Sequence, residues 1–99
     1  MAKYDVYPGL PGQGFLIDVQ ADLFDGLNTR IVAPLMPVEI APSQGKRLNP
    51  TFEIEGQAYS MVSQYISAVP VSQLKDPVTN LSDQFWEISD ALDMLFQGF

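Results

Sequence analysis

The sequence predicts a β-rich α+β domain in which several short strands are followed by one C-terminal helix. Apolar segments of strand length alternate with turn-forming residues as far as Asn80. All 8 prolines lie within residues 8–77, where they exclude long uninterrupted helices. Beyond Asn80 the apolar residues recur at helical spacing. The length of 99 residues suits one domain, so we expect a single domain covering residues 1–99.

Two strands are predicted in the N-terminal third. The aromatic run at residues 4–7 forms the first, and the proline- and glycine-rich loop at residues 8–12 ends it. The second covers residues 15–20, in which apolar and polar side chains alternate. Its core-facing side chains are expected to be Phe15, Ile17 and Val19. Asp18 and Gln20 are expected to face the other way.

A third strand is predicted at residues 30–35, after a turn at residues 25–28. Pro34 removes a backbone donor from this strand, which favours an edge position or a bulge. The polar segment at residues 42–47 contains a glycine and is predicted to be the most mobile loop.

A β-hairpin and one further strand complete the predicted sheet. The hairpin pairs residues 51–54 with residues 58–62, and Glu55-Gly56-Gln57 joins them. Gly56 supplies the positive φ that such a turn needs. Residues 69–71 are predicted to form the last short strand.

The C-terminal helix is predicted from residues spaced 4, 3, 4 and 3 apart. Its core-facing residues are Leu81, Phe85, Ile88, Leu92 and Leu95. Asn80 or Ser82 can cap the N-terminus, and Gly98 is placed to end the helix in the left-handed conformation. The acids expected on the outer side are Asp83, Glu87, Asp90 and Asp93.

The composition limits the function. The net charge of −7 repels phosphate backbones, which makes direct nucleic-acid binding improbable as the main role. The chain has no cysteine and no histidine, and we expect no metal ion or other cofactor. It lacks the apolar run of a signal peptide and any apolar stretch of about 18 residues, so we expect a cytoplasmic protein without membrane contact.

Several segments, in order along the chain, resemble the CcdB family of toxins. They are residues 4–7, 15–23, 27–35 and 68–71, and the helix that ends at Gly98 and Phe99. The most specific parts are Asp18-Val19-Gln20 and the strand that begins with Arg30 and ends in Pro34-Leu35.

The resemblance implies an SH3-like barrel of the CcdB/MazF type, with a twisted antiparallel sheet, a small second sheet and a C-terminal helix. It implies a homodimer with the two helix ends near the two-fold axis. It also implies a non-enzymatic toxin that binds the A subunit of DNA gyrase, traps the cleaved gyrase–DNA complex and is neutralised by a CcdA-like antitoxin. Carried over by position, the gyrase-binding residues are Ala21, Leu23, Phe24, Asp93, Phe96, Gln97, Gly98 and Phe99.

Gln97 departs from the family pattern, in which the last three residues often read Trp-Gly-Ile. Glutamine lacks the aromatic face that can pack on an arginine of gyrase, and aromatic anchors of this kind are often worth about 2 kcal/mol. One alternative is therefore a non-toxic homologue that keeps dimer and antitoxin binding but has lost gyrase binding. A second is a MazF/Kid-like endoribonuclease using Arg30 and Asp22, although a shared fold does not transfer chemistry.

Other conspicuous residues have simpler interpretations. Trp86 lies about three turns before the chain end, too far to replace the missing tryptophan, and a packing role is favoured for it. Phe96 and Phe99 are favoured as contacts with a partner. Asp18 and Asp22 are expected to be solvated acids at a strand end rather than metal ligands.

Overall fold

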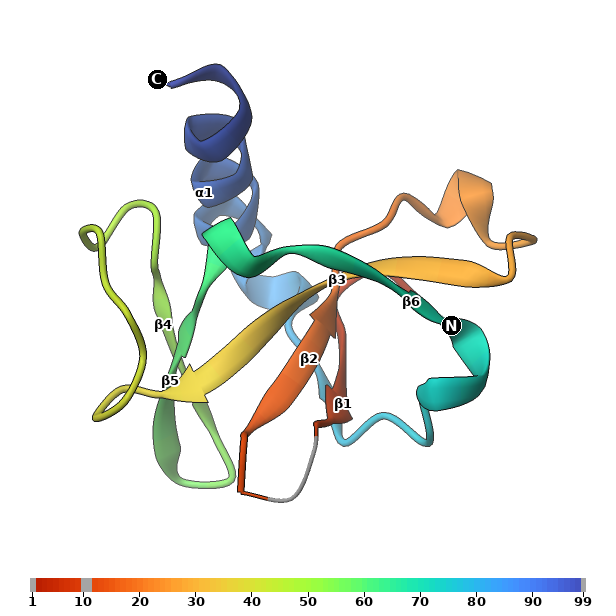
Figure 1. Ribbon diagram of the computed structural model, residues 1–99, viewed down its shortest axis with the longest axis horizontal. Helices are drawn as coiled ribbons and strands as arrows, with labels where there is room; N and C mark the ends of the chain where they lie inside the picture. Colours follow the sequence, from red (N-terminus) through yellow and green to blue (C-terminus); the bar gives the residue numbers. More distant parts are fainter. Residues whose placement is uncertain (1, 10–11, 99) are drawn as a thin grey trace.

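The computed structural model describes residues 2–9 and 12–98, which form seven strands, four 3-10 turns and one α-helix (Figure 1). The strands are β1 (Asp5–Pro8), β2 (Phe15–Asp18), β3 (Thr29–Pro37), β4 (Thr51–Ile54), β5 (Gln57–Met61), β6 (Ser67–Pro70) and β7 (Thr79–Asn80). The 3-10 turns are η1 (Asp22–Phe24), η2 (Ser63–Tyr65), η3 (Val71–Gln73) and η4 (Ser82–Gln84). The helix is α1 (Phe85–Gln97).

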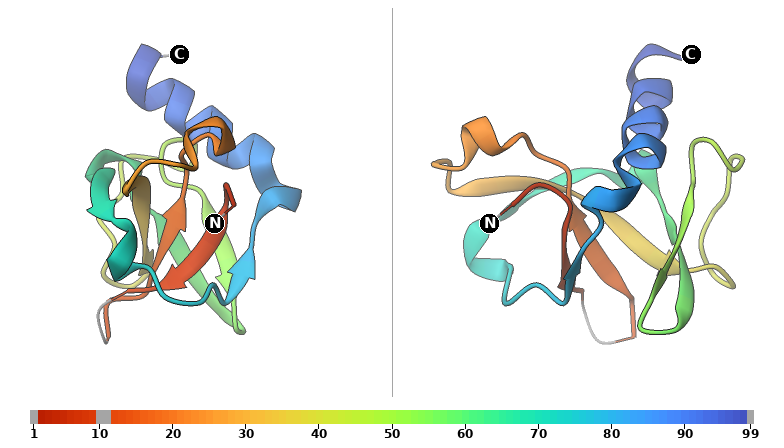
Figure 2. Two further views of the ribbon diagram at one scale, coloured as in Figure 1. Left: turned by 90° about the vertical axis from the view of Figure 1, so that its right-hand side faces the viewer. Right: turned by 180° about the vertical axis from the view of Figure 1, so that it is seen from behind.

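All strand pairings among these residues are antiparallel, in the order β4-β5-β3-β2-β1-β7, with β6 also paired to β3. The sheet curls into a nearly closed barrel and α1 packs against it, which confirms the predicted β-rich α+β SH3-like barrel (Figures 1 and 2). β5 pairs with β3, so the β4–β5 hairpin is hydrogen-bonded into the same sheet and does not form a second one. The short strand β7 was not predicted, because two residues carry no alternation to detect.

Of the two positions predicted for Pro34, an edge strand or a bulge, the edge is wrong, because β3 pairs with neighbours on both sides. One edge of β3 pairs with β2 along residues 32–35. Its other edge pairs first with β6, up to Val32, and then with β5, from Leu35 onward. Pro34 lies between these two partners, and its carbonyl accepts a hydrogen bond from the Val62 amide at 2.9 Å. Because neither β5 nor β6 pairs with β3 at Pro34, no ladder hydrogen bond is lost through the missing N–H of the proline.

The predicted hairpin is confirmed, and its loop consists of two residues. Ile54 pairs with Gln57, so only Glu55 and Gly56 form the turn. Both have positive φ, at 53° and 81°, as in a type I′ turn. The glycine was predicted to adopt this conformation, whereas Glu55 was not, since few non-glycine residues do.

The core lies between the sheet and α1. The helix contributes Ile88 and Ala91, which are fully buried, and the preceding residue Leu81 is 6% exposed. Leu92 packs against the same cluster, as predicted. Strand side chains complete the cluster, including Val6, Ile17, Val19, Ala33, Leu35, Phe52, Ile54 and Met61.

Two predictions for the start of the helix are wrong. Phe85 is 41% exposed rather than buried, and Trp86 is 73% exposed rather than packed. The reason is that the helical turn begins later than predicted: residues 82–84 form a 3-10 turn, which changes the rotation between Leu81 and the residues of α1. In residues 2–9 and 12–98, no helix is both long and apolar enough to cross a membrane.

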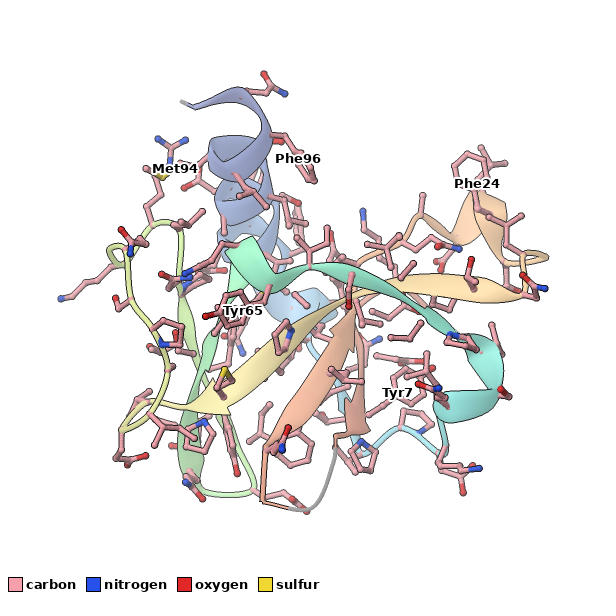
Figure 3. The ribbon with its side chains drawn as sticks, viewed as in Figure 1. Tyr7, Phe24, Tyr65, Met94 and Phe96 are labelled. Carbon is pink, nitrogen blue, oxygen red and sulfur yellow. The ribbon has the colours of Figure 1, made fainter. Side chains whose placement is uncertain are left out.

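A second, smaller cluster contains Tyr7, Val32 and Leu74, which are buried together on the other face of the sheet. Tyr7 is 1% exposed and its hydroxyl donates to Asp5 Oδ2 at 3.4 Å (Figure 3). Burial raises the pKa of this phenol from 10.0 to about 12, and the charges of Asp5 and Asp18 add to the effect. The folded protein therefore keeps Tyr7 protonated at a pH where the unfolded chain loses that proton.

We predict that this difference destabilises the protein between about pH 10 and 12. In that range the unfolded chain binds fewer protons than the folded one, so the free energy of unfolding falls as the pH rises. The contribution of Tyr7 is of the order of 2 kcal/mol, and about half of it is lost by pH 11. Urea unfolding at pH 9 and pH 11 measures it. Tyr7→Phe should lose less stability over this interval than the parent, and Tyr65→Phe, at an exposed tyrosine, should lose as much. Equal losses in all three proteins would contradict the prediction.

Candidate functional site

The centre of the candidate site is a buried ion pair between β2 and β3. Asp18 and Arg30 are both 0% exposed, and Arg30 is the largest fully buried side chain. Asp18 Oδ2 lies 2.6 Å from Arg30 Nη2 and accepts a hydrogen bond from Arg30 Nε at 2.8 Å. Burial raises the pKa of Asp18 above its ordinary value, although the hydrogen bonds from Arg30 and from the Gln20 amide act in the opposite direction. The expectation that Asp18 is solvated is therefore wrong.

Arg30 also holds the segment that follows β2. Its Nη1 donates to Asp25 Oδ1 at 3.2 Å, and its Nη2 lies 3.5 Å from the carbonyl oxygen of Gln20. Gln20 is 8% exposed, and its side-chain amide connects η1 with β3. Nε2 donates to the Phe24 carbonyl at 3.0 Å, and Oε1 accepts from the Ile31 amide at 3.1 Å. These bonds fix both ends of η1 to the barrel.

Asp22 ties η1 to the N-terminal segment. Its Oδ1 accepts the Lys3 amide at 2.8 Å and lies 3.9 Å from Arg30 Nη2. The side chain is 64% exposed, as expected for this residue. Among residues 2–9 and 12–98, no group of three histidines, cysteines or acids is arranged to hold a metal ion.

The polar network lies beneath η1, so the apolar side chains of this turn point outward. Leu23 is 84% exposed and Phe24 is 51% exposed. Ala21, which precedes the turn, is exposed as well. Leu23 and Phe24 are thus large apolar side chains that remain exposed on a turn held to the barrel by hydrogen bonds.

The end of α1 presents a second apolar group. Gly98 has φ 78° and ψ 10°, and its amide donates to the Met94 carbonyl at 2.9 Å, which confirms the predicted left-handed helix end. Phe96 is 70% exposed, and Asp93, Gln97 and Gly98 are exposed around it. Apart from its chain neighbours and the backbone of its own helix, no atom of the described residues lies within 4 Å of a Cβ placed on Gly98, so a side chain there meets mainly backbone strain. The predicted contact residue Phe99 lies outside the described residues.

The two groups project from the same side of the barrel. Figure 3 shows Phe24 and Phe96 at the top of the molecule, with Phe96 pointing toward the side on which η1 lies and Met94 pointing away from it. The turned views keep η1 and the end of α1 on this side (Figure 2). The two segments that carry seven of the eight predicted contact residues, η1 with the preceding Ala21 and the end of α1 with Gly98, therefore lie on the same side of the barrel.

The geometry does not support the endoribonuclease alternative. A nuclease needs a cation that reaches the phosphate in the transition state. Arg30 is enclosed and bonded to Asp18 and Asp25, so it cannot approach a phosphate. Asp22 is exposed, but the cation that lies 3.9 Å from it is this enclosed Arg30 guanidinium.

A groove elsewhere on the barrel was not predicted from the sequence. It has a volume of about 670 Å³ and mainly apolar walls, and Tyr65 at its rim is visible in Figure 3. Its lining includes Phe15, Leu16, Pro34, Met36, Ile40 and Tyr65. These residues come from β2, β3, η2 and the segment after β3, and no periodic pattern in the sequence links them.

In a comparison with known protein families, a family model matches nearly the whole chain. The family model described as "CcdB protein" matches residues 3–98. The match includes the strands that carry Asp18 and Arg30, η1, and α1 up to Gly98.

We predict that the buried pair contributes much more to stability than the exposed bond to Asp25. Asp18→Ala leaves Arg30 buried without its main partner and should lower the free energy of unfolding by about 3–5 kcal/mol. Asp25→Ala, at a side chain that is 59% exposed, should cost less than about 1 kcal/mol. Urea unfolding at pH 7 compares them, and equal costs would contradict the prediction.

The double variant Asp18→Leu with Arg30→Met separates the effect of the ion pair on stability from its effect on the position of η1. The apolar pair should restore much of the free energy of unfolding that Asp18→Ala loses. Without Arg30, however, η1 should open more often, which faster hydrogen exchange at the Phe24 and Asp25 amides would reveal.

Proposed function

The chain belongs to the CcdB family, and we propose that it acts by binding the A subunit of DNA gyrase and trapping the cleaved gyrase–DNA complex. Family membership supports a toxin of a toxin–antitoxin system. We further propose that residues 1–99 form one toxin domain, that it works in the cytoplasm as a homodimer, and that a CcdA-like antitoxin neutralises it.

One observation carries the proposal: two exposed apolar groups stand on the same side of the barrel, each on a rigid support. The turn that carries Leu23 and Phe24 is held by the Gln20 side chain and by the bond from Arg30 to Asp25, and Phe96 lies on a helix that Gly98 ends. Aromatic and large apolar side chains at a contact of this kind usually dominate the binding energy. The proposed gyrase contact consists of Ala21, Leu23, Phe24, Asp93, Phe96, Gln97, Gly98 and Phe99.

A protein of this kind needs no catalytic group to stop an enzyme. A ligand shifts an equilibrium by its difference in affinity for the two states. If the toxin binds gyrase more tightly when the DNA is cleaved, each factor of ten in that difference of affinity stabilises the cleaved state by about 1.4 kcal/mol. We therefore propose a poison that acts by binding, which is consistent with a buried Arg30 and with the absence of histidine and cysteine from the chain.

Gln97 favours one second candidate, a homologue that keeps its dimer and its antitoxin but does not bind gyrase. Its side chain is exposed at the centre of the proposed contact. An amide offers hydrogen bonds but no flat aromatic surface, so the contact loses a typical anchor. The same experiment distinguishes the two functions.

We predict that the purified protein causes linear, protein-linked DNA to accumulate when it is added to gyrase, ATP and supercoiled plasmid. Gly98→Glu should abolish this product, because it puts a charge into the contact. The exposed position should let the variant fold with a loss of only about 1 kcal/mol at the helix end. Gly98→Asn is the matched control, since asparagine tolerates positive φ and adds no charge.

The same assay tests η1. Leu23→Ser should raise the toxin concentration needed for half-maximal cleavage at least tenfold. Val38→Ser, at another exposed apolar residue, should leave it unchanged. No linear DNA from the folded, dimeric parent would reject gyrase poisoning and support the non-toxic homologue.

We also predict that Gln97→Trp tightens binding to the gyrase A subunit by about thirtyfold, which corresponds to about 2 kcal/mol. Isothermal titration calorimetry with the parent and the variant measures the change. A variant that binds more weakly than the parent would mean that this chain docks on gyrase in a different way.

A further inference from the structure

An exposed aromatic pair marks the first turn of α1. The rings of Phe85 and Trp86 lie 4.8 Å apart at 32°, and the two side chains are 41% and 73% exposed. Neither ring is needed for the core, because Ile88 and Ala91 form the buried face of the helix. The start of α1 faces the viewer in the right-hand panel of Figure 2.

Carboxylates surround this pair. Asp83, Glu87 and Asp90 are all exposed, and Asp90 lies four residues after Trp86, on the same side of the helix. We name Asp83, Phe85, Trp86, Glu87 and Asp90 the aromatic–acidic face. One arginine of the chain already binds there: Arg47 Nε and Nη2 donate to the two carboxylate oxygens of Asp90 at 2.9 Å and 3.0 Å.

We propose that the aromatic–acidic face docks an arginine-bearing segment of a partner protein. One guanidinium would stack on the Trp86 indole, and neighbouring cations would pair with Asp83 and Glu87. Arginine suits this face because its planar, weakly hydrated group stacks on aromatic rings and pairs with carboxylates at once. The bidentate Arg47–Asp90 pair shows the second of these contacts on the same face.

Charge complementarity selects this occupant. A second copy of the chain carries a net charge of −7 and would bring the same carboxylates opposite each other. Of its five cations, Arg30 and Arg47 are engaged by its own acids. Nucleic acids and anionic lipid surfaces are repelled for the same reason. A cationic protein segment is attracted, and its arginine covers the exposed rings.

The aromatic rings of the face lie at the opposite end of α1 from Phe96 and Gln97, although Asp90 is within one turn of Asp93. The proposal goes beyond the gyrase-poison function and does not depend on it. Eleven residues of helix separate Trp86 from Gln97, which corresponds to about 16 Å along the axis. Variants at one end of α1 can therefore be tested without altering the other.

Trp86 is the only tryptophan of the chain, so its fluorescence reports on the face directly. The probe is a blocked pentapeptide of alternating arginine and glycine. Matched peptides replace arginine by lysine or by citrulline, which keeps the shape and removes the charge. We expect saturable quenching by the arginine peptide, affinity at least fivefold lower for the lysine peptide, and no saturation with citrulline.

Calorimetry with variants assigns the site. Trp86→Ala should lower the affinity for the arginine peptide at least tenfold, and the double variant Asp83→Asn with Glu87→Gln should lower it at least fivefold. Glu39→Gln with Asp76→Asn removes the same charge from exposed acids elsewhere and should change the affinity less than twofold. Gly98→Glu should also leave it within twofold.

Three results would overturn the proposal. The first is no saturable binding of the arginine peptide, or equal binding of the citrulline peptide. The second is loss of binding in Gly98→Glu but not in Trp86→Ala, which would place the peptide at the helix end. The third is a change of oligomeric state in Trp86→Ala by sedimentation, which would make the face a contact between copies.

Discussion

The ion pair between Asp18 and Arg30 is the interaction on which the exposed surface of this protein depends. A charged pair sealed inside a barrel is costly unless its remaining donors are satisfied. Here the remaining donors of Arg30 reach Asp25 and the Gln20 carbonyl, which belong to the segment around η1. The pair therefore specifies where that segment lies, and the segment in turn holds Leu23 and Phe24 in water. A purely apolar core at this point would remove the bonds from Arg30 to Asp25 and to the Gln20 carbonyl, and η1 would keep only the bonds made by Gln20 and Asp22.

The parts of the fold that local chemistry determines could be predicted from the sequence. The Glu55-Gly56 turn and the left-handed Gly98 follow from conformations that few residues other than glycine adopt. The central position of β3 could not be predicted, because a proline in a strand usually signals an edge. Only the change of partner strand beside Pro34 makes the residue acceptable there. The 3-10 turn before α1 similarly displaced Phe85 and Trp86 from their predicted positions.

The candidate site was predicted through family resemblance, and the structure adds the reason for its geometry. Nothing in the spacing of Asp18 and Arg30 shows that they meet, since 12 residues separate them and the strand alternation placed Asp18 on the outer side. Long-range pairing of charged residues has no periodic signature. The exposure of Leu23 and Phe96 likewise depends on which side of the barrel each element faces. Short-range patterns predict elements better than the surfaces those elements share.

The change of partner along β3 also bears on aggregation. A sheet is vulnerable where a row of unpaired backbone groups can accept a foreign strand. Between β5 and β6 the edge of β3 offers no such row, because Pro34 has no N–H and its carbonyl accepts the Val62 amide. The outermost strands of the path, β4 and β7, have four and two residues, and Glu53 is exposed on β4. The barrel therefore has few free backbone groups with which another chain could pair. It can expose apolar side chains without also exposing an edge that promotes aggregation.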